Sequence, residues 1–190
     1  MLIFLETDRL TLRRFTEADE DNLVELDGDP EVMRFLSGGR PTPREEVRSR
    51  ILPALFRQYG QGPDFGFWAA EEKSTGRFLG WFHFRPYKNG PRDGDIELGY
   101  RLRRSAWGRG YATEGSRALI HKGFTDLGVE RVVAETMTAN TASRRVLEKA
   151  GLTLVRTFHR EGLDAVEGSE HGVVEYALIK ADWKPELEEL

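Results

Sequence analysis

"DIELGYRLRRSAWGRGYATEGSRAL", residues 95–119, is the stretch that decides the fold of this chain. Its opening, residues 95–102, alternates in polarity as a β-strand with one buried face does. The stretch then passes through a glycine-rich loop into an amphipathic helix, and RVVAETMT at 131–138 reads as a second strand. Because a helix joins the two strands, the right-handed crossover rule predicts that they form a parallel pair. The apolar positions of the first strand are Ile96, Leu98, Tyr100 and Leu102.

The amino-terminal part of the chain predicts a strand followed by helices. Residues 7–15 alternate in polarity, with Leu10 and Leu12 on the buried side and Arg13 among the residues on the other side. Pro53 should kink or interrupt the last of the helices. Three capping signals begin these helices: Thr16, Asp29 before Pro30, and Thr42 before Pro43.

Strands and helices interleave over the rest of the chain. This order predicts a single mixed α/β domain spanning 1–190, with a central sheet covered by helices. The remaining elements are a hairpin at 65–86 with its turn at 74–76, a helix from Asn140 to Gly151, and apolar runs at 152–158 and 173–179.

The composition excludes several classes of protein. The chain has 190 residues, no cysteine and a net charge of −4. Without cysteine there is no disulfide scaffold, no thiolate nucleophile and no cysteine-based zinc site. The four histidines are scattered without metal-ligand spacing, so no metal is expected. The acidic balance argues against nucleic-acid binding, and no apolar run is long enough to span a bilayer, so a cytoplasmic protein is predicted.

The glycines of the quoted stretch allow three interpretations. A Rossmann fingerprint starting at Gly108 fails, because Thr113 stands where its third glycine must be. A Walker loop from Gly110 to Gly115 fails as well, because Ser116 stands where lysine must be. The third interpretation is a row of free backbone N–H groups that grips an anion at a helix amino terminus. A tight strand-to-helix turn, with glycines for steric reasons only, remains the alternative.

Four segments of the chain together resemble the GNAT N-acetyltransferases, in particular the branch of the ribosomal-protein amino-terminal acetyltransferases (RimJ/RimL-like). The resemblance implies a mostly antiparallel, splayed central sheet with one parallel pair, flanked by helices. It also implies acetyl-CoA-dependent transfer of an acetyl group to a primary amine. The segments are LETDRLTLRRFTEADEDNLVELDGDPEVMRFL at 5–36, GDIELGYRLRRSAWGRGYATEGSRALIHKGF at 94–124, RVVAETMTANTASRRVLEKAGL at 131–152 and HGVVEYALIKADW at 171–183.

The resemblance places the acetyl-CoA site on the glycine loop. The family string Gln/Arg-x-x-Gly-x-Gly/Ala falls on residues 107–112, and Trp107 replaces its polar first residue. Arg109 and Arg104 could supplement the positive charge. The edge of the preceding strand at Tyr100, Arg101 and Leu102 would pair with the amides of pantetheine. The CoA pyrophosphate would lie on Gly108, Arg109, Gly110, Tyr111, Ala112 and Thr113.

The same resemblance suggests catalytic residues. Glu97, on the strand face opposite Ile96, is the candidate general base, although a surface glutamate is an equal reading. Weaker candidates are Glu161 and His159. Asn140, already an expected helix cap, would also bond pantetheine, and Ser143 would face the thioester sulfur. Leu147 stands where many relatives place a tyrosine acid, so Ser143 or water must serve. A backbone N–H near Leu98 or Gly99 would receive the carbonyl oxygen.

The expected chemistry is direct attack by the amine, since no cysteine can carry an acyl group. Freeing a lysine-like amine of its proton at neutral pH costs roughly 4.6 kcal/mol, and freeing an α-amine costs about 1.4 kcal/mol. The acceptor itself is not readable, because the loops 37–42, 86–94 and 159–172 carry no motif. The alternatives are an acyl-CoA-binding regulatory domain without turnover and a nucleotide-phosphate site. A homodimer is expected by analogy only.

Overall fold

The computed structural model describes residues 2–60, 62–87, 93–164 and 166–185. These residues contain a sheet with the strand order β1-β2-β3-β4-β5-β6-β8-β7, in which every neighbouring pair is antiparallel except β5 and β6. The fold is therefore the predicted mixed α/β class with a single parallel pair. The strands are β1 (Ile3–Glu6), β2 (Leu10–Arg13), β3 (Gly66–Glu72), β4 (Phe78–Pro86), β5 (Ile96–Leu102), β6 (Arg131–Met137), β7 (Thr153–Phe158) and β8 (Val173–Ile179).

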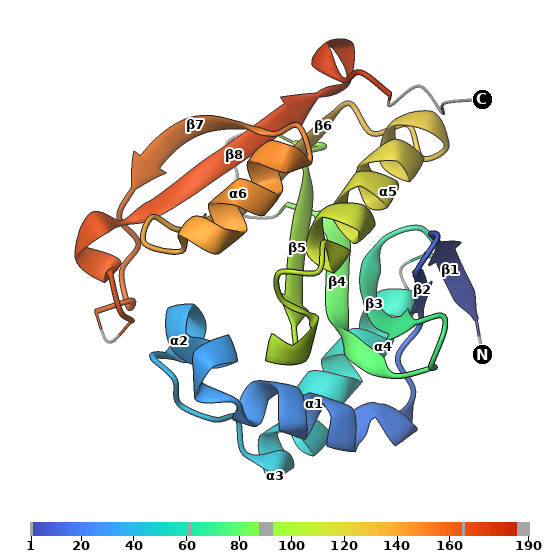
Figure 1. Ribbon diagram of the computed structural model, residues 1–190, viewed down its shortest axis with the longest axis vertical. Helices are drawn as coiled ribbons and strands as arrows, with labels where there is room; N and C mark the ends of the chain where they lie inside the picture. The colour runs from blue at the N-terminus through green and yellow to red at the C-terminus, as the bar shows by residue number, and fades with distance from the viewer. Residues whose placement is uncertain (1, 61, 88–92, 165, 186–190) are drawn as a thin grey trace.

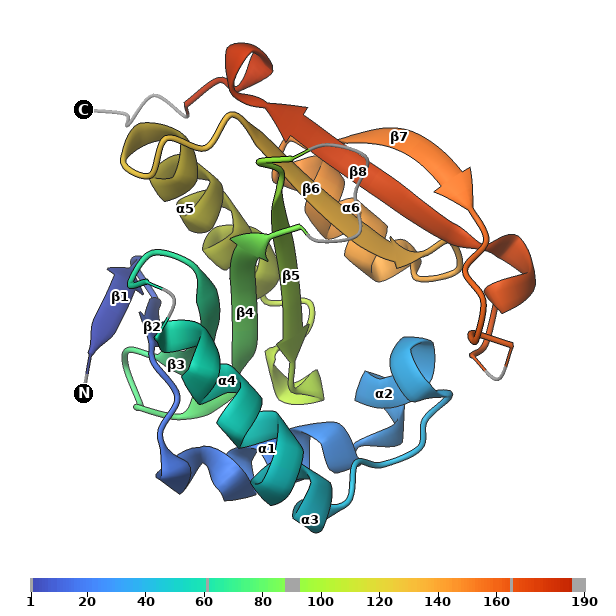
Figure 2. The same cartoon turned by 180° about the vertical axis from the view of Figure 1, so that it is seen from behind.

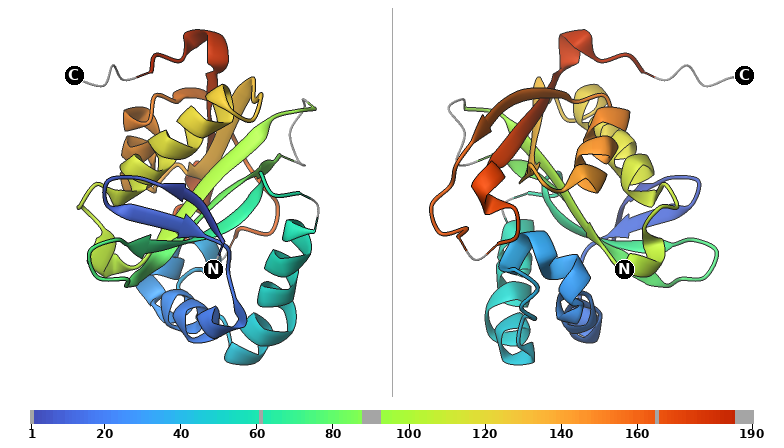
Figure 3. Two further views of the ribbon diagram at one scale, coloured as in Figure 1. Left: turned by 90° about the vertical axis from the view of Figure 1, so that its right-hand side faces the viewer. Right: turned by 60° about the vertical axis from the view of Figure 1, so that its left-hand side comes forward.

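Helices lie on both faces of this sheet (Figures 1 and 3). On one face, apolar side chains of α5 and α6 join the larger core cluster, and on the other face those of α1 and α4 join a second cluster. Within the described ranges, no helix combines the length and the apolar character needed to cross a membrane. The helices are α1 (Glu20–Gly28), α2 (Pro30–Ser37), α3 (Arg44–Glu46), α4 (Leu52–Tyr59), α5 (Tyr111–Thr125) and α6 (Thr141–Lys149).

Most helix-start signals act as predicted. Thr16 and Asp19 form a reciprocal capping box, and the Asp29 side chain accepts a hydrogen bond from the Glu31 N–H with Pro30 in the first turn. Pro53 lies just after a wide helical turn at Val47–Ile51, and the backbone stays helical from 44 to 59, so the helix is distorted before the proline and not interrupted. The prediction for Thr42 is wrong.

The helix expected after Thr42 begins one residue later, at Arg44, with Pro43 at the N-cap. The Thr42 N–H is bonded to the Asp27 carbonyl at 3.1 Å. This bond ties the residue to the end of α1, and no side-chain cap forms at this helix start.

The parallel pair is unusually short for the length of its strands. Both strands run for seven residues, but their ladder consists of two pairs, Ile96 with Val132 and Glu97 with Val133. Beyond Glu97 the strands diverge, and Figure 2 shows β5 and β6 meeting near one end and parting toward α2. The sheet is thus split between β5 and β6, as the family resemblance implied.

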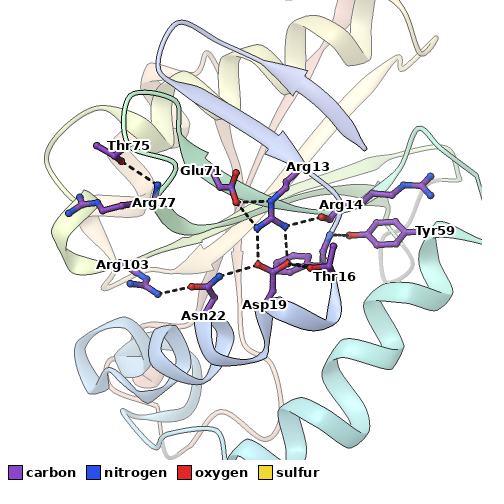
Figure 4. Close-up of polar contacts among 11 residues, drawn as sticks. Arg13, Arg14, Thr16, Asp19, Asn22, Tyr59, Glu71, Thr75, Arg77 and Arg103 are labelled. Atoms are coloured by element: carbon purple, nitrogen blue, oxygen red, sulfur yellow. Dashed lines mark hydrogen bonds and ion pairs between the residues drawn. The ribbon is translucent and has the colours of Figure 1, made fainter. Parts of the chain in front are cut away.

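A buried ionic cluster attaches the first helices to the sheet (Figure 4). The Arg13 guanidinium contacts Asp19 at 2.8 Å and Glu71 at 2.6 Å, and both Arg13 and Asp19 are buried. Burial opposes ionisation of Asp19, but hydrogen bonds from Arg13, Thr16 and Asn22 outweigh it and lower its pKa below 3.8. Arg13 was expected on the polar side of its strand; that side is covered by the helices, so the charge is buried and paired.

We predict that Asp19→Asn destabilises the protein strongly. The variant leaves the buried Arg13 with Glu71 as its one charged partner among the described residues, and breaking a buried ion pair costs about 3 kcal/mol or more. Urea denaturation followed by circular dichroism measures the change. Glu46→Gln, which removes an exposed pair with Arg50, is the control and should move the midpoint little. Equal midpoints for the two variants would contradict the structural importance of the cluster.

Candidate active site

The main-chain groups of β5 alternate between its two neighbours. The Tyr87 N–H donates to the Asp95 carbonyl and the Arg103 N–H donates to the Leu79 carbonyl, both at 2.8 Å. In an antiparallel ladder such bonded positions recur at every second residue. The odd-numbered residues of β5 therefore turn their N–H and C=O groups toward β4, and the even-numbered residues turn theirs toward β6.

This alternation decides which predicted groups face the split. The main chain of Tyr100 lies past the last β5–β6 rung, on the side of the split. The Leu102 carbonyl is on the same side and accepts the Trp107 indole N–H at 2.7 Å. Of the two amides expected to receive a carbonyl oxygen, that of Leu98 faces β6 at the last rung, whereas that of Gly99 faces β4.

The glycine loop presents free donors where the strands have parted. Gly108 and Gly110 adopt φ angles of +69° and +85°, and Gly110 is the N-cap of α5. Among the described residues, no group accepts a hydrogen bond from the backbone N–H groups of residues 108–113. The loop from Trp107 to Gly110 is exposed. A row of unpaired N–H groups at the positive end of a helix is a suitable site for an anion.

The third glycine has a different role. A Cβ at Gly115 would lie 2.4 Å from the Phe82 ring, so this position is glycine because α5 packs closely on the sheet. The steric alternative thus applies to Gly115. At Gly108 and Gly110 the positive φ is required, and the N–H groups of both residues have no acceptor among the described residues.

Charged side chains surround the loop in an arrangement that the sequence did not reveal. Arg9, from the turn before β2, donates to the Arg109 carbonyl at 2.9 Å and to Glu114 at 2.6 Å. Arg109 itself is 48% exposed and approaches Glu72 at 3.4 Å. Arg104, expected to add charge here, pairs with Asp29 at the start of α2 at 2.6 Å. Arg9 lies a hundred residues away in the chain, and no motif marks it.

Glu97 lies at the last rung, on the face of the sheet that carries α1. Its Oε2 contacts Arg85 at 2.8 Å and His83 at 3.5 Å, and its side chain is 16% exposed. Among the described residues, no hydrogen-bond donor or cation pairs with its other carboxylate oxygen. Glu97 is thus held in place by one oxygen while the second stays available to a ligand.

His83 is a buried imidazole beside this carboxylate. Burial, together with the charges of Arg85 and Arg101, lowers its pKa to about 3, so the ring is neutral at pH 7. Both ring nitrogens lack a hydrogen-bond partner among the described residues. A Cβ at Gly99 would lie 2.5 Å from the ring, so only glycine at that position leaves room for His83.

The opposite face of the sheet carries a pair of hydroxyl groups. The Asn140 side chain caps α6 by accepting the Ser143 N–H at 3.1 Å, as predicted. The Ser143 Oγ lies 3.0 Å from the Tyr100 Oη. Leu147 is buried in the core. Glu97 and the hydroxyl pair thus lie on opposite faces of the sheet, next to the split.

Several predicted residues are not brought to the split. Arg101 turns its main chain to β4, and its guanidinium pairs with Asp27 of α1 at 2.5 Å. His159 and Glu161 are exposed beyond the end of β7, where the His159 ring contacts the Glu170 carbonyl at 3.2 Å. Of the expected acceptor loops, residues 88–92 and 165 lie outside the described part of the chain.

Sequence reasoning also missed two side chains beside the split. The strand period predicts the backbone edge at Tyr100 but carries no signal for its hydroxyl, which meets Ser143. Glu135 of β6, two residues past Val133, shares the face of Glu97 and contacts the Tyr87 hydroxyl and Arg160. Both residues follow the β period, but no sequence signal shows which strand neighbours would part.

Comparisons with known proteins agree on a family. The family described as "Acetyltransferase (GNAT) domain" matches residues 9–153. A curated relative from Aspergillus fumigatus, FsC-acetyl coenzyme A-N(2)-transacetylase, is 34% identical over 184 residues, covering 94% of this chain and 77% of the relative.

Solved structures share the fold. RimL, a ribosomal L7/L12 alpha-N-protein acetyltransferase in complex with coenzyme A, has a TM-score of 0.77 at 21% identity, covering 93% of this chain and 97% of that one. Spermidine N-acetyltransferase from Vibrio cholerae, in complex with CoA and spermine, has a TM-score of 0.72 at 14% identity, covering 93% and 98%.

We predict that His83 makes the protein acid-labile well above the pH at which carboxylates titrate. The pKa of His83 is about 3 in the folded protein and 6.5 in the unfolded chain. As the pH falls, the unfolded chain therefore takes up a proton at His83 before the folded protein does. Stability should therefore decline below about pH 6.5, by about 1.4 kcal/mol per pH unit.

Denaturant unfolding at a series of pH values checks this prediction. His83→Gln should remove this part of the slope, and His171→Gln, at an exposed position, should retain it. A slope that is the same in wild type and His83→Gln would contradict the prediction.

Proposed function

Because the chain belongs to the GNAT acetyltransferase family and is an N-acetyltransferase, we propose that it transfers the acetyl group of acetyl-CoA to a primary amine by direct attack. The observation that carries this proposal is the row of unpaired N–H groups at residues 108–113, at the end of the strand that borders the split. Acetyl-CoA supplies the acetyl group as a thioester.

The residues present fit CoA along its length. The N–H row and the amino terminus of α5 offer donors and positive potential to a pyrophosphate. The Tyr100 carbonyl, past the last rung, offers an acceptor to the amides of pantetheine, as a sheet edge does to an added strand. Asn140, at the start of α6, is the side chain we assign to the same arm. Arg101 is left out of this assignment because it faces away.

The proposed chemistry uses both faces of the sheet. Glu97 accepts the proton of the attacking amine through its unpaired oxygen. The Tyr100 N–H, just past the last rung, donates to the carbonyl oxygen as negative charge develops. Ser143, on the opposite face, donates to the departing sulfur. With no cysteine in the chain, the amine attacks the thioester itself.

The acceptor we propose is the α-amine of a peptide or a small amine, with the protein in the RimJ/RimL-like branch. The fold similarity to RimL and to a spermidine N-acetyltransferase is consistent with either kind of acceptor. Deprotonating an α-amine at neutral pH costs only about 1.4 kcal/mol, whereas deprotonating a lysine-like amine costs roughly 4.6 kcal/mol. We therefore expect the carboxylate held by Arg85 to serve as base for an α-amine more readily than for lysine. Cytoplasmic location and a homodimer stay predictions.

A thiol-release assay with a panel of peptides and amines tests the function. We expect acetyl-CoA-dependent thiol release with at least one acceptor class. Gly110→Asp should abolish CoA binding in calorimetry, because it places a carboxylate among the phosphate-binding donors. Gly128→Asp is the matched control, since Gly128 also has a positive φ, at the other end of α5, with open space around it. Binding without release would favour the regulatory-domain alternative, and undiminished binding in Gly110→Asp would refute the loop assignment.

Glu97→Gln should lower turnover about a hundredfold while leaving the affinity for acetyl-CoA unchanged. The defect should shrink as the pH rises toward the pKa of the amine, because a neutral amine no longer needs a base. Steady-state kinetics over a pH series measure both effects. The comparison variant is Glu161→Gln, at an exposed position, which should retain full turnover. If Glu161→Gln shows the loss instead, the base is on the loop after β7.

A further inference from the structure

The Tyr100 hydroxyl belongs to none of the steps above, although it lies beside one of them. It comes from β5, and its oxygen lies 3.0 Å from the Ser143 Oγ and 3.2 Å from the Ser143 carbonyl on α6. The ring is half-buried and packs against Phe82 with 5.9 Å between centroids. Phe82 is in turn fixed by the close approach of Gly115. The phenol is therefore held at Ser143 from a different element of the fold.

The hydroxyl protons of Tyr100 and Ser143 can be arranged in two ways. A tyrosine and a serine hydroxyl each carry one proton and can accept further hydrogen bonds. If Tyr100 donates to the Ser143 carbonyl, the Ser143 proton is free to point back at the phenol oxygen. If Tyr100 donates to the Ser143 Oγ, the Ser143 proton must point elsewhere. An anion beside Ser143 favours the second arrangement, because hydrogen bonds to charged acceptors are the stronger ones.

We propose, building on the proposed function, that Tyr100 is a positioning residue that donates to Ser143 Oγ and so directs the Ser143 proton at the sulfur of CoA. When the amine nitrogen bonds to the carbonyl carbon, the carbon–sulfur bond breaks and its electron pair remains on sulfur. The two hydroxyls stabilise this thiolate as a hydrogen-bonded chain, and each keeps its own proton. The thiolate is neutralised by a proton from solvent, which balances the one that Glu97 took from the amine.

The properties of both side chains fit this role better than proton transfer. Burial raises the pKa of Tyr100 above its ordinary value of 10, so the phenol stays neutral and donates a hydrogen bond without ionising. Hydrogen bonds in such a chain polarise one another, which strengthens the last donor. Ser143 also lies in the first turn of α6, where the helix dipole favours a negative charge.

A double-mutant cycle tests the coupling. Tyr100→Phe and Ser143→Ala should each lower kcat about ten- to a hundredfold with the KM for acetyl-CoA unchanged, which is the loss expected for a hydrogen bond to a charged group. The double variant should be no slower than Ser143→Ala, because Tyr100 acts only through Ser143. Tyr176→Phe is the matched control, since its hydroxyl also holds α6, through Arg144 and Glu148, without touching Ser143. It should retain wild-type turnover.

A second readout requires no acceptor. Donation to sulfur favours the thiolate, so the thiol of CoA bound to the wild type should have a lower pKa than in either single variant. Calorimetric CoA binding over a pH series measures this pKa, and thermal unfolding confirms that each variant is folded. Multiplicative losses of kcat in the double variant, or an unchanged thiol pKa in Tyr100→Phe, would overturn the proposal while leaving the proposed function intact. Failure of the wild type to bind CoA would overturn both.

Discussion

Among the described residues, the backbone ladder between β5 and β6 has two rungs, at Ile96 and Glu97, and the site depends on where this ladder stops. Past the second rung, main-chain groups that a regular sheet would consume are left unpaired. Buried backbone groups need partners, so a divergence of this kind persists where water or a ligand supplies them. The split therefore provides a binding edge inside a sheet, with no loop needed to form it.

The helices around the split determine what each of its sides can do. On one face Glu97 is held by Arg85 beside the buried His83, and Gly99 is required to make room for that ring. On the other face α6 brings Ser143 to Tyr100. A group lying in the split could therefore meet a carboxylate from one side and hydroxyls from the other. Base and thiolate-stabilising donors can be separated in this way without competing for the same space.

Contacts far apart in sequence keep the loop and the strands in place. Arg9 ties the turn before β2 to the Arg109 carbonyl and to Glu114 in the first turn of α5. The Arg13 cluster ties the same amino-terminal segment to the first helices. Because Arg9 uses the carbonyl of the loop and a carboxylate, the loop's N–H groups stay free. The amino-terminal segment thus supports the glycine loop without occupying it.

The sequence by itself determined the order of the elements from β2 onward, the parallel pair, the capping residues Thr16, Asp29 and Asn140, and the glycine loop before α5, because these depend on local periodicity and backbone preferences. It predicted a single amino-terminal strand, where the structure has both β1 and β2. It could not show that Arg13 is buried, that Arg101 turns to α1, or that the Tyr100 phenol meets Ser143. Those outcomes depend on which faces the helices cover and where β5 leaves β6. Such contacts join residues distant in the chain, so only the tertiary structure decided them.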